Sequence, residues 1–317
     1  MEIKDLLKKQ HYALVGKSSS VQICRWAKRA LLDEGFCYKQ QFYGIKSHLC
    51  CQMSPATLFC QNKCMHCWRA IEFSLGDKMK KEDVDEPKEI IDKCILAQRK
   101  MLTGFKGNKK INMEKWKEAQ NPSQFAISLS GEPTVYPKLG ELIKELRIRK
   151  ITSFLVTNGL NPEILEKLGK EGNLPTQLYV SLNSSNKEDY EHWHRSIKKD
   201  AWKRFNETLE LFPKLNTRKV VRMTLVREKN MSEPENYAKL IKKANPDFVE
   251  VKAYMSVGFA RERMGYETMP THAETRKFAE EIASFIPEYK ILDEKVESRV
   301  VLLGKSKARM KIKESEL

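Results

Sequence analysis

The sequence contains no long hydrophobic run. None of its segments reaches the ~20 consecutive apolar residues that a membrane-spanning helix needs. The first residues, MEIKDLLKKQHYALVGKSSS, are polar and charged and lack the apolar stretch of a signal peptide. We therefore expect a soluble, cytoplasmic protein with no membrane partner.

Acidic residues are in deficit. The chain has 42 Asp and Glu against 58 Lys and Arg, which gives a formal net charge of +16. An excess of this size is typical of proteins that bind a polyanion, and nucleic acid is the first candidate. The alternative is that scattered lysines only form a solvated surface.

Three of the eight cysteines stand close together in LFCQNKCMHCW, residues 58–68. A structural zinc site would need four ligands, so zinc would require His66 or a distant thiol besides Cys60, Cys64 and Cys67. A four-iron cluster held by three cysteines keeps one iron open for a substrate or cofactor. In a reducing compartment, metal ligands or free thiols are expected rather than disulfides.

Short apolar runs rich in Val, Ile, Leu and Thr predict buried parallel strands at 125–131, 151–159, 177–184, 219–226 and 247–255. Helical stretches between them are long enough for right-handed crossovers, and a further helix is expected within 21–35. This order predicts an α/β fold with a full or partial barrel. Its site should lie where the strands end. Those ends carry Ser130, Gly131, Glu132, Pro133, Thr157, Asn158, Gly159, Ser181, Asn183, Ser184, Tyr254, Met255 and Ser256.

A Cys-x3-Cys-x2-Cys loop at the start of repeated βα units, followed by a strand ending in Gly131-Glu132-Pro133, resembles the radical S-adenosylmethionine (SAM) superfamily. The resemblance implies a partial (βα)6 TIM-like barrel. It implies that Cys60, Cys64 and Cys67 bind a [4Fe-4S] cluster whose fourth iron chelates SAM, and that Glu132 accepts hydrogen bonds from the SAM ammonium group. Gly131, Ser130, Thr157, Asn158, Ser181 and Asn183 are the further candidates for SAM contacts.

Two residues depart from the superfamily pattern. His66 stands where an aromatic residue that contacts adenine is usual, and Trp68 could compensate for it. Ser130-Gly131 replaces the more familiar Gly-Gly pair.

Cys24, Cys37 and Cys50 are separated by twelve residues each time. This spacing resembles the archaeal 4-demethylwyosine synthase family, and the resemblance extends over almost the whole chain. It implies a second [4Fe-4S] cluster on these thiols, pyruvate as a substrate, and Lys39 as the lysine that forms a Schiff base with pyruvate. Cys51 could replace Cys50 as a ligand, and Cys94 is expected to be a core thiol.

The family resemblance further implies the reaction. N1-methylguanosine beside the anticodon of tRNA(Phe) would condense with pyruvate to form the tricyclic wyosine base. Because no flavodoxin domain is seen in the sequence, an external electron donor of the flavodoxin or ferredoxin type is expected, and we expect a monomer. Candidate tRNA contacts are Lys106, Lys109, Lys110, Lys198, Lys199, Arg261, Arg263 and the tail from Lys305 to Lys313, with Trp193 or Trp202 for base stacking.

We expect three parts: an extension with the second set of cysteines at 1–54, a radical SAM core at 55–286 and a basic extension at 287–317. Two alternatives stay open. One is another radical SAM enzyme with an auxiliary cluster that acts on RNA, protein or a small molecule. The other is a non-catalytic RNA-binding protein whose six cysteines hold zinc.

Overall fold

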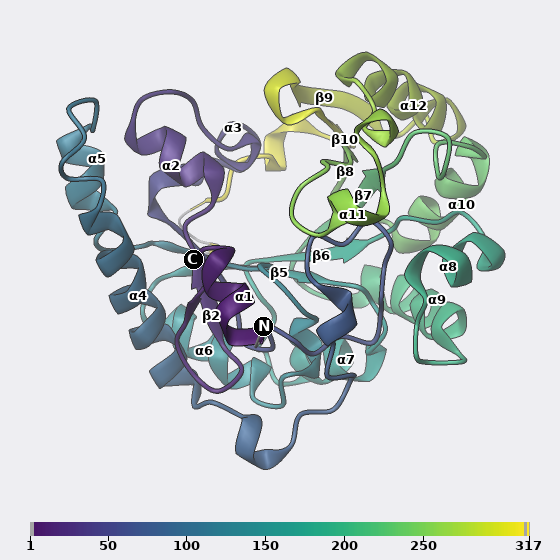
Figure 1. Ribbon diagram of the computed structural model, residues 1–317. Coiled ribbons are helices and arrows are strands. Elements are labelled where there is room, and N and C mark those ends of the chain that lie inside the picture. Colours follow the sequence, from purple (N-terminus) through teal and green to yellow (C-terminus); the bar gives the residue numbers. More distant parts are fainter. Residues whose placement is uncertain (1–2, 314–315, 317) are drawn as a thin grey trace.

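One curved sheet runs through the whole molecule (Figure 1). The computed structural model describes residues 3–313 and 316. Within these residues the strand order is β1-β2-β3-β4-β5-β6-β7-β8-β10-β9. The strands are β1 Ala13–Leu14, β2 Ser20–Gln22, β3 Cys50–Ser54, β4 Gln124–Ile127, β5 Thr152–Thr157, β6 Gln177–Ser181, β7 Arg218–Leu225, β8 Phe248–Ala253, β9 Lys290–Lys295 and β10 Val300–Gly304.

Strands β3 to β8 pair in parallel, and both edges of the sheet are antiparallel. The expected α/β fold with a partial barrel is therefore confirmed. Five predicted strands correspond to β4 to β8, and the first parallel strand, β3, was not predicted. The predicted ranges 1–54, 55–286 and 287–317 all contribute strands to this one sheet, and the division into three parts stays a prediction.

Helices cover the outer face of the sheet, and two short helices cross its open side. Figure 1 shows α4, α6, α7, α9 and α10 around the outside, whereas α2 and α3 lie in the gap between the two ends of the sheet. The helices are α1 Ile3–Lys9, α2 Arg25–Leu31, α3 Tyr38–Tyr43, α4 Pro87–Thr103, α5 Met113–Glu118, α6 Leu139–Ile148, α7 Pro162–Lys170, α8 Lys187–His194, α9 Ala201–Leu211, α10 Pro234–Ala244, α11 Ala260–Arg263 and α12 His272–Phe285.

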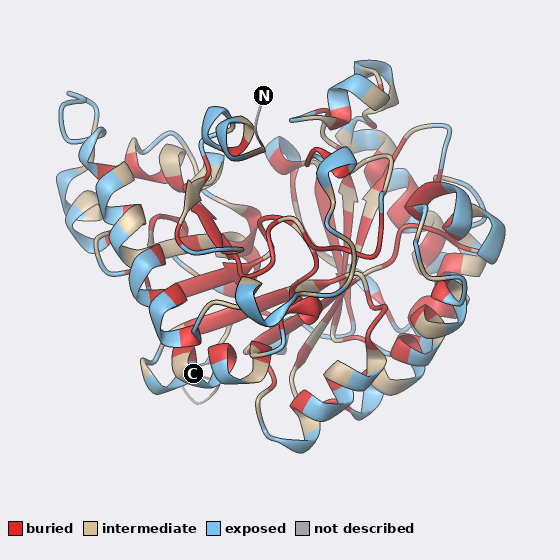
Figure 2. Ribbon diagram, turned by 60° about the horizontal axis from the view of Figure 1, so that its bottom comes forward, coloured by how far each residue is buried: buried red, intermediate tan, exposed pale blue. Residues whose placement is uncertain are grey.

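The hydrophobic core has an outer and an inner layer. In α6, Leu139, Leu142, Ile143 and Leu146 are buried at the spacing that places apolar residues on one helix face, and they join the outer layer between helices and sheet. The inner layer includes Phe42, Phe154 and Tyr179. Figure 2 shows the strands as buried and the outward helix faces as exposed.

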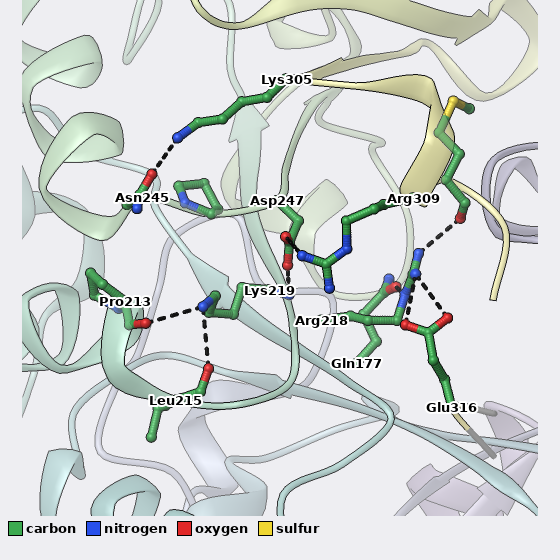
Figure 3. Close-up of polar contacts among 12 residues, drawn as sticks. Gln177, Pro213, Leu215, Arg218, Lys219, Asn245, Asp247, Lys305, Arg309 and Glu316 are labelled. Carbon is green, nitrogen blue, oxygen red and sulfur yellow. Dashed lines mark hydrogen bonds and ion pairs between the residues drawn. The ribbon is translucent and has the colours of Figure 1, made fainter. Parts of the chain in front are cut away.

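The segment after β10 packs against the end of the barrel where the parallel strands begin (Figure 3). Arg218 Nη2 donates to Met310 O at 2.8 Å, and Arg218 also pairs with Glu316. Arg309 Nη1 lies 2.6 Å from Asp247 Oδ1, and Lys305 Nζ donates to Asn245 Oδ1. The basic tail therefore lies at the opposite end of the barrel from the carboxyl ends of its strands. No helix among the described residues is long and apolar enough to cross a membrane.

Candidate active site

The loop with Cys60, Cys64 and Cys67 is held by backbone hydrogen bonds on both sides. Cys60 N donates to Gly76 O at 2.7 Å, and Cys67 N donates to Cys64 O at 3.1 Å. The C-terminal end of α8 accepts two bonds from the loop, from Lys63 N to His194 O and from Met65 N to Trp193 O. The segment 192–195 thus positions the cysteine loop.

Two arginines stabilise the same loop. Arg263, an expected RNA contact, donates instead to the carbonyl oxygens of Met65, Cys67 and Arg69. Arg69 is buried and donates to Asn62 O at 2.5 Å. Burial alone would lower the pKa of Arg69, but the three thiols beside it raise this pKa above its ordinary value. The positive charge of Arg69 acts to lower the pKa of Cys60 and Cys64, although burial raises both.

The donor set fits an iron–sulfur cluster. In the described residues, no group of three or more His, Cys, Asp or Glu side chains is arranged to hold a single metal ion. A four-iron cluster does not require that arrangement, because each thiolate binds a different iron. Burial raises the pKa of Cys60 to about 11, because the buried thiolate is poorly solvated. Binding to iron would stabilise the charged form.

The seven residues predicted for SAM line one cavity with the three cysteines. Its volume is ≈ 160 Å³, and its walls include Ser130, Gly131, Glu132, Thr157, Asn158, Ser181 and Asn183 together with Cys60, Cys64 and Cys67. The strand ends converge here because β4, β5 and β6 are parallel neighbours. Sequence reasoning therefore selected residues that the fold brings together.

Glu132 is buried and its carboxylate is closely held. Oε1 accepts from Thr134 Oγ1 and Thr157 Oγ1, each at 2.6 Å, and from Thr134 N at 3.1 Å. Oε2 accepts from Asn158 N at 2.7 Å. Burial raises the pKa of Glu132, although these hydrogen bonds act in the opposite direction. Oε2 is the oxygen with spare capacity for a ligand donor.

Gly131 lies at a close approach between the end of β4 and the cysteine loop. Its φ is +70°, and a Cβ atom there would lie 1.9 Å from Ala56 O and 2.7 Å from Phe59 O. Glu132 N donates to Phe59 O at 2.7 Å across this contact. Glycine is required here both for backbone conformation and for space.

His66, which departs from the superfamily motif, and Trp68, which could compensate for it, both line the cavity. Burial lowers the pKa of His66 to about 4, with Arg263 as a further cause, so its ring is neutral at pH 7. Its Nε2 lies 3.4 Å from Asn183 Nδ2. Trp68 is partly exposed, and its Nε1 donates to Leu129 O at 3.0 Å.

Cys24, Cys37 and Cys50 each stand at the start of an element. Cys24 precedes α2 and its Sγ accepts from Ala27 N at 3.3 Å; Cys37 precedes α3; Cys50 begins β3. Burial raises the pKa of Cys50, and the neighbouring thiols of Cys24 and Cys37 raise it further. The structure thus brings the three thiols together.

Cys51 faces the other side of β3, because successive strand residues alternate. It is fully buried in the outer core with Cys94 of α4. Cys94 is the core thiol that was expected.

Lys39 in α3 is buried inside the barrel near the second group of thiols. Its Nζ lies 4.3 Å from the ring centroid of Tyr179 and 5.0 Å from that of Phe154. Burial lowers the pKa of Lys39, whereas Glu250, Cys37 and Cys50 raise it. Loss of solvation therefore favours the neutral, nucleophilic amine.

Two family models match successive parts of the chain. The radical SAM superfamily model matches residues 54–241, and the model described as wyosine base formation matches residues 243–305. The S-adenosyl-L-methionine-dependent tRNA 4-demethylwyosine synthase of Pyrococcus horikoshii is 49% identical over 302 residues, which cover 95% of this chain and 88% of the relative. The chain belongs to the tRNA 4-demethylwyosine synthase family.

A second relative and two solved structures agree with this membership. The Methanocaldococcus jannaschii synthase is 35% identical over 95% of each chain. A structure of TYW1 with a lysine–pyruvate adduct bound is 34% identical, with a TM-score of 0.86, and covers 98% of this chain and 97% of the other. A crystal structure of archaeal TYW1 is 31% identical, with a TM-score of 0.79, and covers 98% of both chains.

In this 4-demethylwyosine synthase family member, a larger groove of ≈ 1070 Å³ is lined by Cys24 of the second cysteine group and by Trp68, which follows the first. Its walls contain five Lys and Arg residues but only two acidic residues, Glu34 and Glu262. The basic residues are Lys9, Arg25, Lys28, Arg29 and Arg261. We call this feature the basic groove.

Several functional residues of the synthase fold could not be identified from sequence. Arg69 comes two residues after Cys67, and this short distance in the sequence was the only sign that it lies at the site. The lysines and arginines of α2 escaped notice because the helix was assigned to an appendage. Trp193 is buried, which leaves its ring no room to stack on a base, whereas Trp202 is partly buried against the core and its stacking role stays a prediction.

Proposed function

We propose that this protein condenses pyruvate with N1-methylguanosine beside the anticodon of tRNA(Phe) to form 4-demethylwyosine. The observation that carries the proposal is the position of Lys39, buried on two aromatic rings next to Cys37 and Cys50. A related structure, 34% identical over nearly the whole chain, contains a lysine–pyruvate adduct.

Cys60, Cys64 and Cys67 would hold one [4Fe-4S] cluster with SAM, and Cys24, Cys37 and Cys50 a second one. When bound and reduced by an external flavodoxin- or ferredoxin-type donor, such a cluster would supply the electron for reductive cleavage of SAM to a radical. Glu132 Oε2 would accept a hydrogen bond from the SAM ammonium group, since its other oxygen already accepts three. Thr157 and Asn158 position that carboxylate.

Lys39 would act as the nucleophile toward pyruvate. Its neutral amine would attack the keto carbon to form a carbon–nitrogen bond, both amine protons would leave with the keto oxygen as water, and the resulting imine would become an iminium by taking up one proton from solvent. The Phe154 and Tyr179 rings shield this group from solvent and can also stabilise its positive charge.

The basic groove is where we place the RNA. A base of a single-stranded loop can be splayed out and bound by stacking while cations contact phosphates. Trp68 lines both the groove and the SAM cavity, so a base stacked near it would lie between the two sites. The tail from Lys305 to Lys313 is left out because it lies at the opposite end of the barrel. Cytoplasmic location and the monomeric state stay predictions.

The pyruvate role is tested by replacing Lys39 with Ala. Borohydride should trap pyruvate on the reconstituted wild-type protein, and the reduced adduct should map to the peptide with Lys39. Lys39→Ala should abolish both the adduct and product formation. Lys46→Ala removes an exposed lysine of the same region and should change neither. Product formed by Lys39→Ala at the wild-type rate would refute the Schiff base.

The RNA site is tested by salt dependence. The double variant Arg25→Ala and Lys28→Ala should bind tRNA more weakly, and its slope of log K against log salt should fall by roughly one for each lost phosphate contact. The pair Lys305→Ala and Lys307→Ala removes the same charge from the tail and should leave the slope unchanged. A larger loss of tRNA affinity in the tail variant would show that the RNA binds at the tail and not in the basic groove.

A further inference from the structure

Arg222 of β7 has an unused hydrogen-bond donor inside the barrel. Its Nε is buried and has no hydrogen-bond partner among the described residues, although the side chain as a whole remains partly accessible. A buried donor left without an acceptor destabilises the folded protein. Such a group is expected to meet its acceptor in a ligand.

The neighbouring carboxylate does not satisfy this donor. Arg222 is opposite Glu250 in the pairing of β7 with β8, but the Glu250 oxygens accept from Tyr38 Oη at 2.8 Å and Tyr43 Oη at 2.7 Å. On the other side, Arg222 is paired with Ser181 of the SAM cavity. Val220, two residues earlier on β7 and therefore on the same face, is opposite Tyr179, whose ring centroid lies 4.3 Å from Lys39 Nζ. Arg222 and Lys39 therefore lie on the same inner face of the sheet.

Positive charge is in excess around Arg222. Lys252 follows Glu250 by two residues on β8 and therefore lies on the same face of the sheet as Glu250 and Arg222. Three potential cations, Lys39, Arg222 and Lys252, thus share their surroundings with one carboxylate, that of Glu250. Unbalanced buried charge costs several kcal/mol. Thiolates bound to iron would offset part of this excess, and a small organic anion would offset the rest.

We propose that Arg222 binds the carboxylate of the 2-oxo acid whose keto carbon reacts with Lys39. This inference rests on the proposed function and adds the residue that selects the acid. In a 2-oxo acid the carboxylate carbon is bonded to the keto carbon, so a guanidinium near Lys39 can hold one while the amine attacks the other. The planar guanidinium matches a carboxylate in a way that an ammonium group does not.

The experiment compares borohydride trapping of pyruvate with that of its uncharged methyl ester, on reconstituted protein of equal iron content. Arg222→Gln should raise the pyruvate concentration for half-maximal trapping by about tenfold or more, as expected for loss of a charged hydrogen bond. Trapping of methyl pyruvate should be unchanged. Arg222→Lys should give a smaller increase for pyruvate only, and it carries the test if Arg222→Gln does not fold.

The outcomes separate the two proposals. If wild-type protein forms no adduct at Lys39, the proposed function fails and this inference fails with it. If wild-type protein is trapped and Arg222→Gln responds to pyruvate as wild type does, only the role of Arg222 is wrong. An equal loss with pyruvate and methyl pyruvate would also overturn it, because a purely structural role does not distinguish an acid from its ester.

Discussion

Replacing Gly131 with Ala should disrupt the contact that joins the cysteine loop to the end of β4. The new Cβ would meet Ala56 O at 1.9 Å and Phe59 O at 2.7 Å, and both are backbone atoms that no side-chain rotation can move. The left-handed backbone alone costs alanine about 1 kcal/mol. If the two backbone segments move apart, the hydrogen bond from Glu132 N to Phe59 O is lost, which adds about 1–3 kcal/mol. The strain of fitting the extra methyl group costs a similar amount.

We therefore expect Gly131→Ala to lower the free energy of unfolding by at least about 3 kcal/mol. Urea unfolding of the anaerobically purified chain, followed by circular dichroism, measures this change. SAM affinity, measured by equilibrium dialysis of the reconstituted protein, should fall more than about tenfold, because Glu132 moves with the broken contact.

Gly172→Ala is the matched control. Gly172 has a φ of +66°, and nothing lies within 4 Å of the position its Cβ would take. This variant should lose only the conformational part, about 1 kcal/mol, and should bind SAM normally. Equal losses in the two variants would refute the close approach at Gly131.

Two further predictions concern stability and metal content. Arg227, and to a smaller extent Thr271, lower the pKa of Glu274 to about 2. The contribution of Glu274 to the free energy of unfolding is therefore complete above its ordinary pKa of 4.5 and is lost as the pH falls from there toward 2. Glu274→Gln should cost at most about 1 kcal/mol at pH 7, since the pair is partly exposed, and should flatten the stability curve between those pH values in urea titrations. Cys50→Ser should lower the iron content by about four per chain and Cys51→Ser should not; iron analysis that shows the reverse would make Cys51 the ligand.

The sequence was informative where one physical rule dominates. Buried parallel strands are continuous apolar runs, so β4 to β8 were predicted to within a few residues. Strand β3, CCQMS, is short and carries a polar Gln52, so it gave no such signal. Within the expected helix at 21–35, the chain first completes β2 at Gln22, and α2 begins only after Cys24 accepts a bond from Ala27 N.

The same distinction applies to the site. Polar residues that end neighbouring parallel strands must converge, which is why the predicted SAM residues share a cavity. Arg263 contacts the cysteine loop from a distant segment, and Arg222 has its neighbours on other strands. Arg69 stands close to the loop in the sequence but lies outside its motif. In a chain with 58 Lys and Arg, local sequence does not separate such residues from surface charges.

The second cysteine group joins the starting points of three elements of the chain. Cys24 begins α2, Cys37 begins α3 and Cys50 begins β3, with twelve residues between successive thiols. Any group bound by all three closes two chain loops and removes disorder from the unfolded ensemble. Binding of a cluster at this site would therefore also be a maturation step, after which amide hydrogens across the open side of the barrel should exchange with solvent more slowly.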